Sequence, residues 1–151
     1  MWNDKDEVVL RLPMKVVSKR WHENSVAFHR GPLLFALGLG EKWEDKREYL
    51  EVYPTSPWNF GLFEDRVLDP EESLVLEVDK KIALNPWTLA TAPLRLKTQG
   101  VRIPDWKLYH NSAGPIPWSP QKRPKDAKEE SLILVPFGST TLRVSEFPTV
   151  N

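Results

Sequence analysis

The sequence predicts an all-β fold, namely an antiparallel β-sandwich of the jelly-roll-like type with seven or eight strands. Fourteen prolines are spread over the 151 residues. Each proline removes a backbone donor and clashes with the preceding helical turn, so long helices are not expected. Short apolar stretches recur between turn signals, which is the pattern of a β-sandwich. The length fits one domain that covers residues 1–151.

Residues 8–17 form the first predicted strand. Apolar side chains alternate there with Arg11, Pro13 and Lys15, which indicates a half-buried strand, and the proline favours a sheet edge. Residues 41–48 are rich in charge and are expected to form a loop or one helical turn. The other strands expected in the first half of the chain are residues 26–30, 33–39 and 49–53.

The second half of the chain contains further short apolar segments around one long irregular region. Residues 110–131 hold four prolines followed by a run of charged side chains. This composition buries too little apolar surface to order itself, so a long solvated loop is expected. The predicted strands around it are residues 73–78, 94–98, 101–103, 132–137 and 140–147.

The charge balance and the length of the apolar runs argue against two classes of partner. Lysine plus arginine and aspartate plus glutamate number 21 each, so the formal net charge is zero. A nucleic-acid partner is not expected, because the sequence lacks the one-sided basic surface that neutralises phosphates. The first residues are polar and acidic, unlike a signal peptide, and no apolar run is long enough to cross a membrane. We expect a soluble chain with no membrane partner, and its localisation is left open.

Patterns typical of catalytic and metal sites are missing from the sequence. There is no cysteine, and the three histidines (His22, His29 and His110) are far apart, so a zinc site would need distant segments to converge. A nucleophile elbow and a dinucleotide fingerprint are also missing. Carboxylates are plentiful but lie in turn-like stretches, so a small hydrolase with a carboxylate pair is the least favoured alternative. The sequence predicts no catalytic residue, metal or cofactor.

Tryptophans and one asparagine are the candidate contact residues for a carbohydrate or another domain. An indole stacks well on the apolar face of a sugar, but its large area also fills cores. Trp58 stands among prolines and phenylalanines and is expected to plug one end of the core. Trp106 and Trp118 lie nearer the long polar loop and are the better candidates for a sugar platform. The candidate residues are Trp58, Asn59, Trp106 and Trp118.

A set of motifs with a common order and spacing extends over almost the whole chain. Examples are Thr-Ser-Pro-Trp-Asn-Phe at residues 55–60 and Arg-Ile-Pro-Asp-Trp at residues 102–106. Together they resemble the carboxy-terminal β-sandwich region of bacterial family 127 glycoside hydrolases, the β-L-arabinofuranosidase-like enzymes. The matching segments are residues 8–14, 26–37, 55–60, 92–97, 102–106, and 134–138 with 142–148.

The resemblance implies a function without catalysis for this chain. In the family, the active site lies mainly on a preceding (α/α)6 barrel, where cysteines and a glutamate hold zinc and one cysteine is the nucleophile. Because this chain has no cysteine, no catalytic residue is carried over. We expect an accessory module that packs against such a catalytic barrel, with homo-oligomerisation left open. Residues 1–20 resemble the end of a preceding sandwich. The alternative is a free-standing carbohydrate-binding module.

Overall fold

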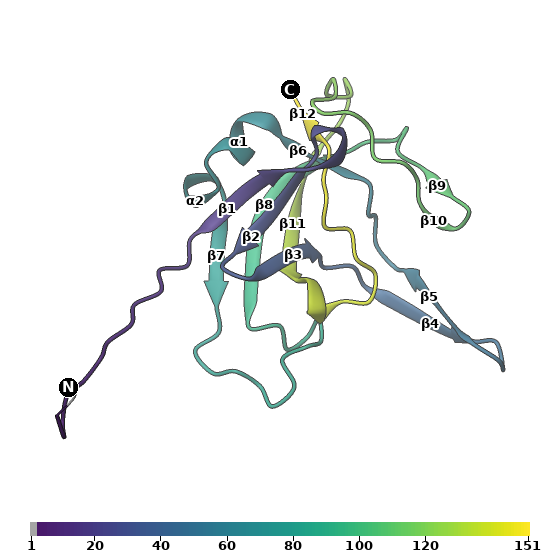
Figure 1. Ribbon diagram of the computed structural model, residues 1–151. Helices are drawn as coiled ribbons and strands as arrows, with labels where there is room; N and C mark the ends of the chain where they lie inside the picture. Colours follow the sequence, from purple (N-terminus) through teal and green to yellow (C-terminus); the bar gives the residue numbers. More distant parts are fainter. Residues whose placement is uncertain (1–2) are drawn as a thin grey trace.

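In the computed structural model, which describes residues 3–151, eight strands form one sheet (Figure 1). The strands run in the order β1-β2-β3-β11-β8-β6-β12, and β7 pairs with β8 beside this path. Neighbouring strands are antiparallel except β12 and β6, which are parallel. The predicted all-β class is therefore confirmed. The strands are β1 (Val16–Arg20), β2 (Val26–Arg30), β3 (Leu33–Leu37), β6 (Phe60–Phe63), β7 (Val75–Val78), β8 (Leu94–Arg102), β11 (Glu129–Pro136) and β12 (Thr149–Val150).

The sheet curls around a large apolar core, and a second, smaller apolar cluster consists of Phe63, Val101, Ile103, Trp106 and Val150. Strand β3 connects the two parts of the sheet, because its first residues pair with β2 and its last three with β11. In β8 and β11, alternate residues such as Leu96 and Leu134 are fully buried, as expected where one face of a strand meets the core. They share a cluster with Phe28, Phe35 and Phe147, which come from both ends of the chain.

Two strands share one edge of β8. Strand β7 pairs with its first half and β6 with its second half. The chain leaves this edge after β6, forms the short helices α1 (Glu64–Leu68) and α2 (Pro70–Ser73), and returns as β7. Gly100 lies between β6 and β11, where an added Cβ would come within 2.8 Å of Leu132 and 2.9 Å of the Gly61 carbonyl oxygen. A side chain at this position would push the flanking strands apart.

Three segments project from the sheet (Figure 1). The N-terminal arm, residues 3–15, is extended and leads into β1. A long hairpin consists of β4 (Glu41–Asp45) and β5 (Leu50–Pro54), and a small one of β9 (Leu108–Tyr109) and β10 (Ser112–Ala113). Two 3-10 turns, η1 (His22–Asn24) and η2 (Phe137–Ser139), follow β1 and β11. None of the helices in residues 3–151 is long and apolar enough to cross a membrane.

Most of the predicted strands are present. The prediction is confirmed for β2, β3 and β5, and for β7 and β11 with shifts of a few residues at their ends. The segments predicted at residues 94–98 and 101–103 join as the single strand β8, because Gly100 continues the pairing with β11. The short apolar strand β6 was missed, since the prolines before it suggest an irregular segment.

Four predicted segments differ from the structure. Residues 8–15 alternate like a strand but pair with nothing in the described chain, and only Val16–Arg20 form β1. Residues 41–45, expected as part of a loop or helical turn, form β4 by pairing with β5, and their charged side chains are tolerated because this two-stranded ribbon is open to solvent. Residues 140–147 are mainly irregular, although Phe147 bridges to Val26. The 110–131 segment includes the β9–β10 turn and is tied to Val150 by a bridge from Gln121.

Candidate functional site

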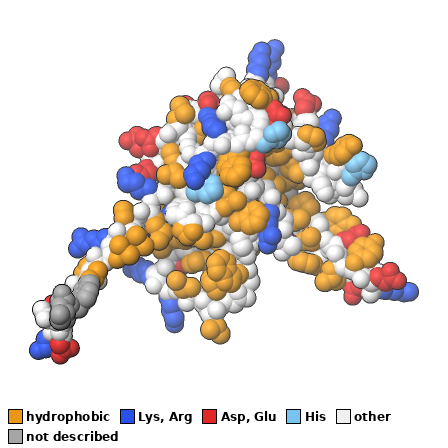
Figure 2. All heavy atoms as spheres, viewed as in Figure 1, with side chains coloured by type: hydrophobic (Ala, Val, Ile, Leu, Met, Phe, Trp, Pro, Cys, Tyr) orange, Lys and Arg blue, Asp and Glu red, His pale blue; other side chains and the backbone are white. Residues whose placement is uncertain are grey.

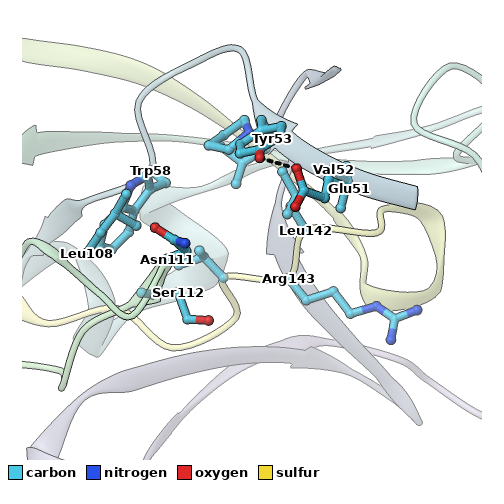
Figure 3. Close-up of a pocket in the computed structure, with 13 residues that line it drawn as sticks. Glu51, Val52, Tyr53, Trp58, Leu108, Asn111, Ser112, Leu142 and Arg143 are labelled. Atoms are coloured by element: carbon cyan, nitrogen blue, oxygen red, sulfur yellow. Dashed lines mark hydrogen bonds between the residues drawn. The ribbon is translucent and has the colours of Figure 1, made fainter. Parts of the chain in front are cut away.

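A groove of about 500 Å³ lies between the β4–β5 and β9–β10 hairpins (Figure 3). We call it the inter-hairpin groove. Strand β5 supplies one side, and the β9–β10 hairpin with Trp58 supplies the other. Apolar side chains from the segment after η2 add to its lining. The lining residues are Leu39, Glu51, Val52, Tyr53, Pro54, Trp58, Leu108, Asn111, Ser112, Ala113, Leu142, Arg143 and Val144.

Trp58 lines the inter-hairpin groove and also packs on the core. It is half-buried and contacts both apolar clusters of the protein. Its ring meets the Trp106 ring edge to face, with centroids 4.9 Å apart and an interplanar angle of 74°. Aromatic pairs with this geometry add about 0.5–1.5 kcal/mol beyond the area that they bury. The packing therefore holds the Trp58 indole in one position at the groove.

The other two tryptophans proposed from the sequence lie in different environments. Trp106 is only 5% exposed and belongs to the second apolar cluster, and its indole Nε1 donates to the Gly114 carbonyl oxygen at 3.0 Å. Its ring therefore supports Trp58 from behind. Trp118 is 63% exposed and does not line the inter-hairpin groove. The structure brings Trp58 and Trp106 together and leaves Trp118 apart.

Asn59 holds two loops together next to Trp58. Its Nδ2 donates to the carbonyl oxygens of Ile103 at 2.9 Å and Trp106 at 3.0 Å. Its Oδ1 accepts a hydrogen bond from Nε of Arg102 at 2.9 Å. The side chain bonds the end of β8 and two carbonyl groups of the segment after it, so it fixes Trp106 in place beneath Trp58.

Tyr53 and Glu51 form a polar pair on the β5 side of the inter-hairpin groove. The Tyr53 hydroxyl donates to a Glu51 carboxylate oxygen, and this bond raises the pKa of Tyr53 above its ordinary value of 10.0. Lys46 Nζ lies 3.5 Å from the same carboxylate, on the exposed hairpin. The phenol therefore stays protonated, and the charge of Glu51 is partly balanced.

Asn111 reaches the groove from the β9–β10 turn. His110 and Asn111 have φ of +48° and +61°, which matches the two-residue hairpin turn with both central residues in the left-handed region. Asparagine tolerates this region better than most residues. Figure 3 shows its carboxamide between Trp58 and the Tyr53–Glu51 pair. Within the described chain, this carboxamide has no hydrogen-bond partner.

Arg143 lines the groove but turns its charge away from it. Its Nε donates to the Thr140 carbonyl oxygen at 3.1 Å, and its guanidinium carbon lies 4.7 Å from the centre of the Phe137 ring. In Figure 3 the guanidinium points away from Tyr53 and Asn111. The groove therefore receives the alkyl part of Arg143, while its positive charge is used elsewhere.

A second candidate surface is apolar and exposed. Hydrophobic side chains extend along the N-terminal arm and over the β4–β5 hairpin (Figure 2). On the arm, Val8, Val9, Leu10 and Leu12 are 66–76% exposed. On the hairpin, Trp43, Tyr49 and Leu50 are more than half exposed. These side chains contribute little to the core of the protein.

Sequence reasoning missed Tyr53 and Asn111. A turn centred on asparagine is a hairpin signal, but the flanking pairs are only two residues long and the prolines that follow suggested a continuous loop. In residues 3–151, no group of three or more His, Cys, Asp or Glu side chains is placed to hold a metal ion.

Comparisons of this chain with protein-family models, curated proteins and solved structures give no match.

Proposed function

We propose that this chain is a non-catalytic accessory module that packs against another domain of a glycoside-hydrolase-like protein. The observation that carries the proposal is the exposed apolar side of the N-terminal arm. Scattered apolar residues are normal on a surface, but a continuous apolar segment with no place in its own core is typical of an interface.

The arm has the form of a segment that packs against a partner surface. Val8, Leu10 and Leu12 alternate with other residues, so they share one side of an extended chain. Residues 7–15 make no backbone hydrogen bond within the described structure. Burying a side chain of this size contributes about 1.5–3 kcal/mol, so the three together contribute several kcal/mol to docking.

The base of the arm is attached to the sheet. Lys15 Nζ lies 2.8 Å from the Glu71 carboxylate of α2, and Met14 packs against Gly31 in the turn between β2 and β3. Beyond this point the arm leaves the surface (Figure 1). The motifs that resemble the family 127 sandwich region support a catalytic (α/α)6 barrel as the partner domain.

The test compares self-association of the purified chain with that of two double variants. Without the partner, the exposed arm should associate with other copies, and zero net charge gives little repulsion to oppose this. In multi-angle light scattering, the apparent mass of the wild type should rise with concentration. The variant Leu10→Ser with Leu12→Ser should stay monomeric, because the apolar side of its arm is broken.

The matched control is Ile82→Ser with Leu84→Ser, which changes two residues of the loop before β8 that are at least as exposed as Leu12. It should associate like the wild type. A wild type that stays monomeric at every concentration, or a control that loses association to the same degree, contradicts the role of the arm. Hydrolysis of aryl α- or β-arabinosides by the purified chain would contradict the non-catalytic part of the proposal.

A further inference from the structure

We propose that the inter-hairpin groove binds a neutral carbohydrate of one or two sugar rings, with Trp58 and Tyr53 as the ring surfaces and Asn111 as the main polar contact. The site is separate from the N-terminal arm and does not depend on the docking function. Its lining comes from β5, the segment before β6, the β9–β10 hairpin and the segment after η2.

The size and rigidity of the groove suit a small ligand. Its volume of about 500 Å³ falls within the usual range of ligand pockets, roughly 300–1,000 Å³. The Trp58 ring is held by Trp106, and Trp106 is held by Asn59 and by the Gly114 carbonyl oxygen. Little ordering is therefore needed when a ligand enters, which favours binding.

The chemistry of the lining matches a sugar, which has apolar C–H faces and a rim of hydroxyl groups. Trp58, Leu108 and Leu142 give an apolar surface. The Asn111 carboxamide offers both a donor and an acceptor, and it has no partner in the described chain. Across the groove, the Tyr53 hydroxyl and the Glu51 carboxylate add acceptors for sugar hydroxyls (Figure 3).

The charges around the groove favour a neutral ligand. The guanidinium of Arg143 is bonded to the Thr140 carbonyl oxygen and lies over Phe137, so it is not free for an anion. The Glu51 carboxylate already accepts from Tyr53 and faces Lys46 at 3.5 Å, which weakens its attraction for a cation. Anionic sugars should therefore bind less well than neutral sugars of the same shape.

The experiment records ¹H–¹⁵N NMR spectra of the full chain while methyl glycosides of glucose, galactose, xylose and mannose, and cellobiose and lactose, are added. At least one should bind with a Kd on the order of 1 mM, as expected for so few contact atoms. The shifted signals should belong to residues 51–58 and 108–113 and to the Trp58 indole. Glucuronate should bind at least several-fold more weakly than methyl glucoside.

Two variants and one control test the contacts. Tyr53→Phe removes a hydroxyl and keeps the ring, and Asn111→Gly removes the carboxamide at a turn position that glycine tolerates. Each should weaken binding by roughly 3- to 10-fold. Tyr49→Phe, which changes an exposed tyrosine of the same hairpin outside the groove, should leave the Kd unchanged.

Several outcomes would overturn the site. These are no shift with any neutral sugar, shifts confined to other surfaces, equal binding of glucuronate, or binding of a proline-rich peptide in place of the sugars. The variant Leu10→Ser with Leu12→Ser should bind sugar as the wild type does, so failure of the arm and failure of the groove give different results.

Discussion

At the scale of single residues, Trp58 has two roles because its ring lies between the core and the inter-hairpin groove. It packs against both apolar clusters and against Trp106. Because Trp58 is half-buried, part of its ring packs on the core and part faces the groove. The same indole thus links stability to the proposed sugar site.

Replacing Trp58 with alanine should lower stability strongly. The change leaves a cavity beside Trp106, and we expect Trp58→Ala to lower the free energy of unfolding by about 3 kcal/mol. For a chain of this size the melting temperature should fall by roughly 6–12 °C. Thermal melts followed by circular dichroism measure the change. Trp118→Ala, at a ring that is 63% exposed, is the control and should stay within about 0.5 kcal/mol of the wild type. Equal melting temperatures of the two variants would contradict the role of Trp58.

The sequence identifies some of these residues and not others. Trp58 stands out because a large side chain next to a proline needs a defined place in the fold, and Asn59 stands out as a polar residue between two aromatic ones. Tyr53 and Asn111 do not stand out, because they are brought together only when two hairpins meet. Their positions depend on tertiary packing, and local pattern carries no information about it.

At the scale of elements, the β4–β5 hairpin is held at its base by Glu41. One carboxylate oxygen of Glu41 accepts from the backbone N–H of Thr141 at 2.6 Å and of Leu142 at 3.3 Å, and from the Thr140 hydroxyl at 3.3 Å. Burial raises the pKa of Glu41, but these hydrogen bonds outweigh burial, so the pKa lies below its ordinary value of 4.5. The charged form of Glu41 therefore stabilises the fold.

The stabilisation by Glu41 should depend on pH. Because its pKa is lower in the folded state, the contribution is present above the ordinary value of 4.5 and is lost as the pH falls through the folded pKa. At pH 7, Glu41→Gln should be less stable than the wild type by about 1 kcal/mol. At about pH 3 the difference should shrink. Urea unfolding at both pH values measures it.

The control for this prediction is Glu48→Gln, at the exposed end of the same hairpin, which should match the wild type at both pH values. A difference between Glu41→Gln and the wild type that is constant over the pH range would show that charge on Glu41 is unimportant.

Elements were predictable where burial creates a pattern. Strands β2, β3 and β11 are apolar because neighbours cover them, and they appear near their predicted positions. Strand β4 lacked such a pattern, since a two-stranded ribbon in solvent carries charge on both faces. Residues 8–15 alternate between apolar and polar side chains like a strand, but no neighbouring strand in the described chain pairs with them. Alternation alone therefore predicted a strand that is absent from the sheet.

At the scale of the whole molecule, the N-terminal arm should be separable from the fold. Limited trypsin digestion should cleave after Arg11, because the surrounding residues are exposed and unpaired. The remaining fragment should melt within about 2 °C of the intact chain, since the removed residues bury almost nothing. Mass spectrometry and thermal melts check both points. Protection of Arg11 in the monomeric chain would mean that the arm packs on its own sheet.

The position of β11 in the sheet has a consequence for how the chain folds. Strand β11 lies between β3 and β8, although it follows both by many residues in the sequence. Before β11 is added, strands β1 to β3 and strands β6 to β8 form two separate half-sheets. Their apolar faces are exposed, and the edges at β3 and β8 are unpaired. Because closing such long loops precedes any gain from pairing, folding should be slow, on the order of milliseconds to seconds. During synthesis the open edges of these half-sheets can pair with other chains until β11 is added.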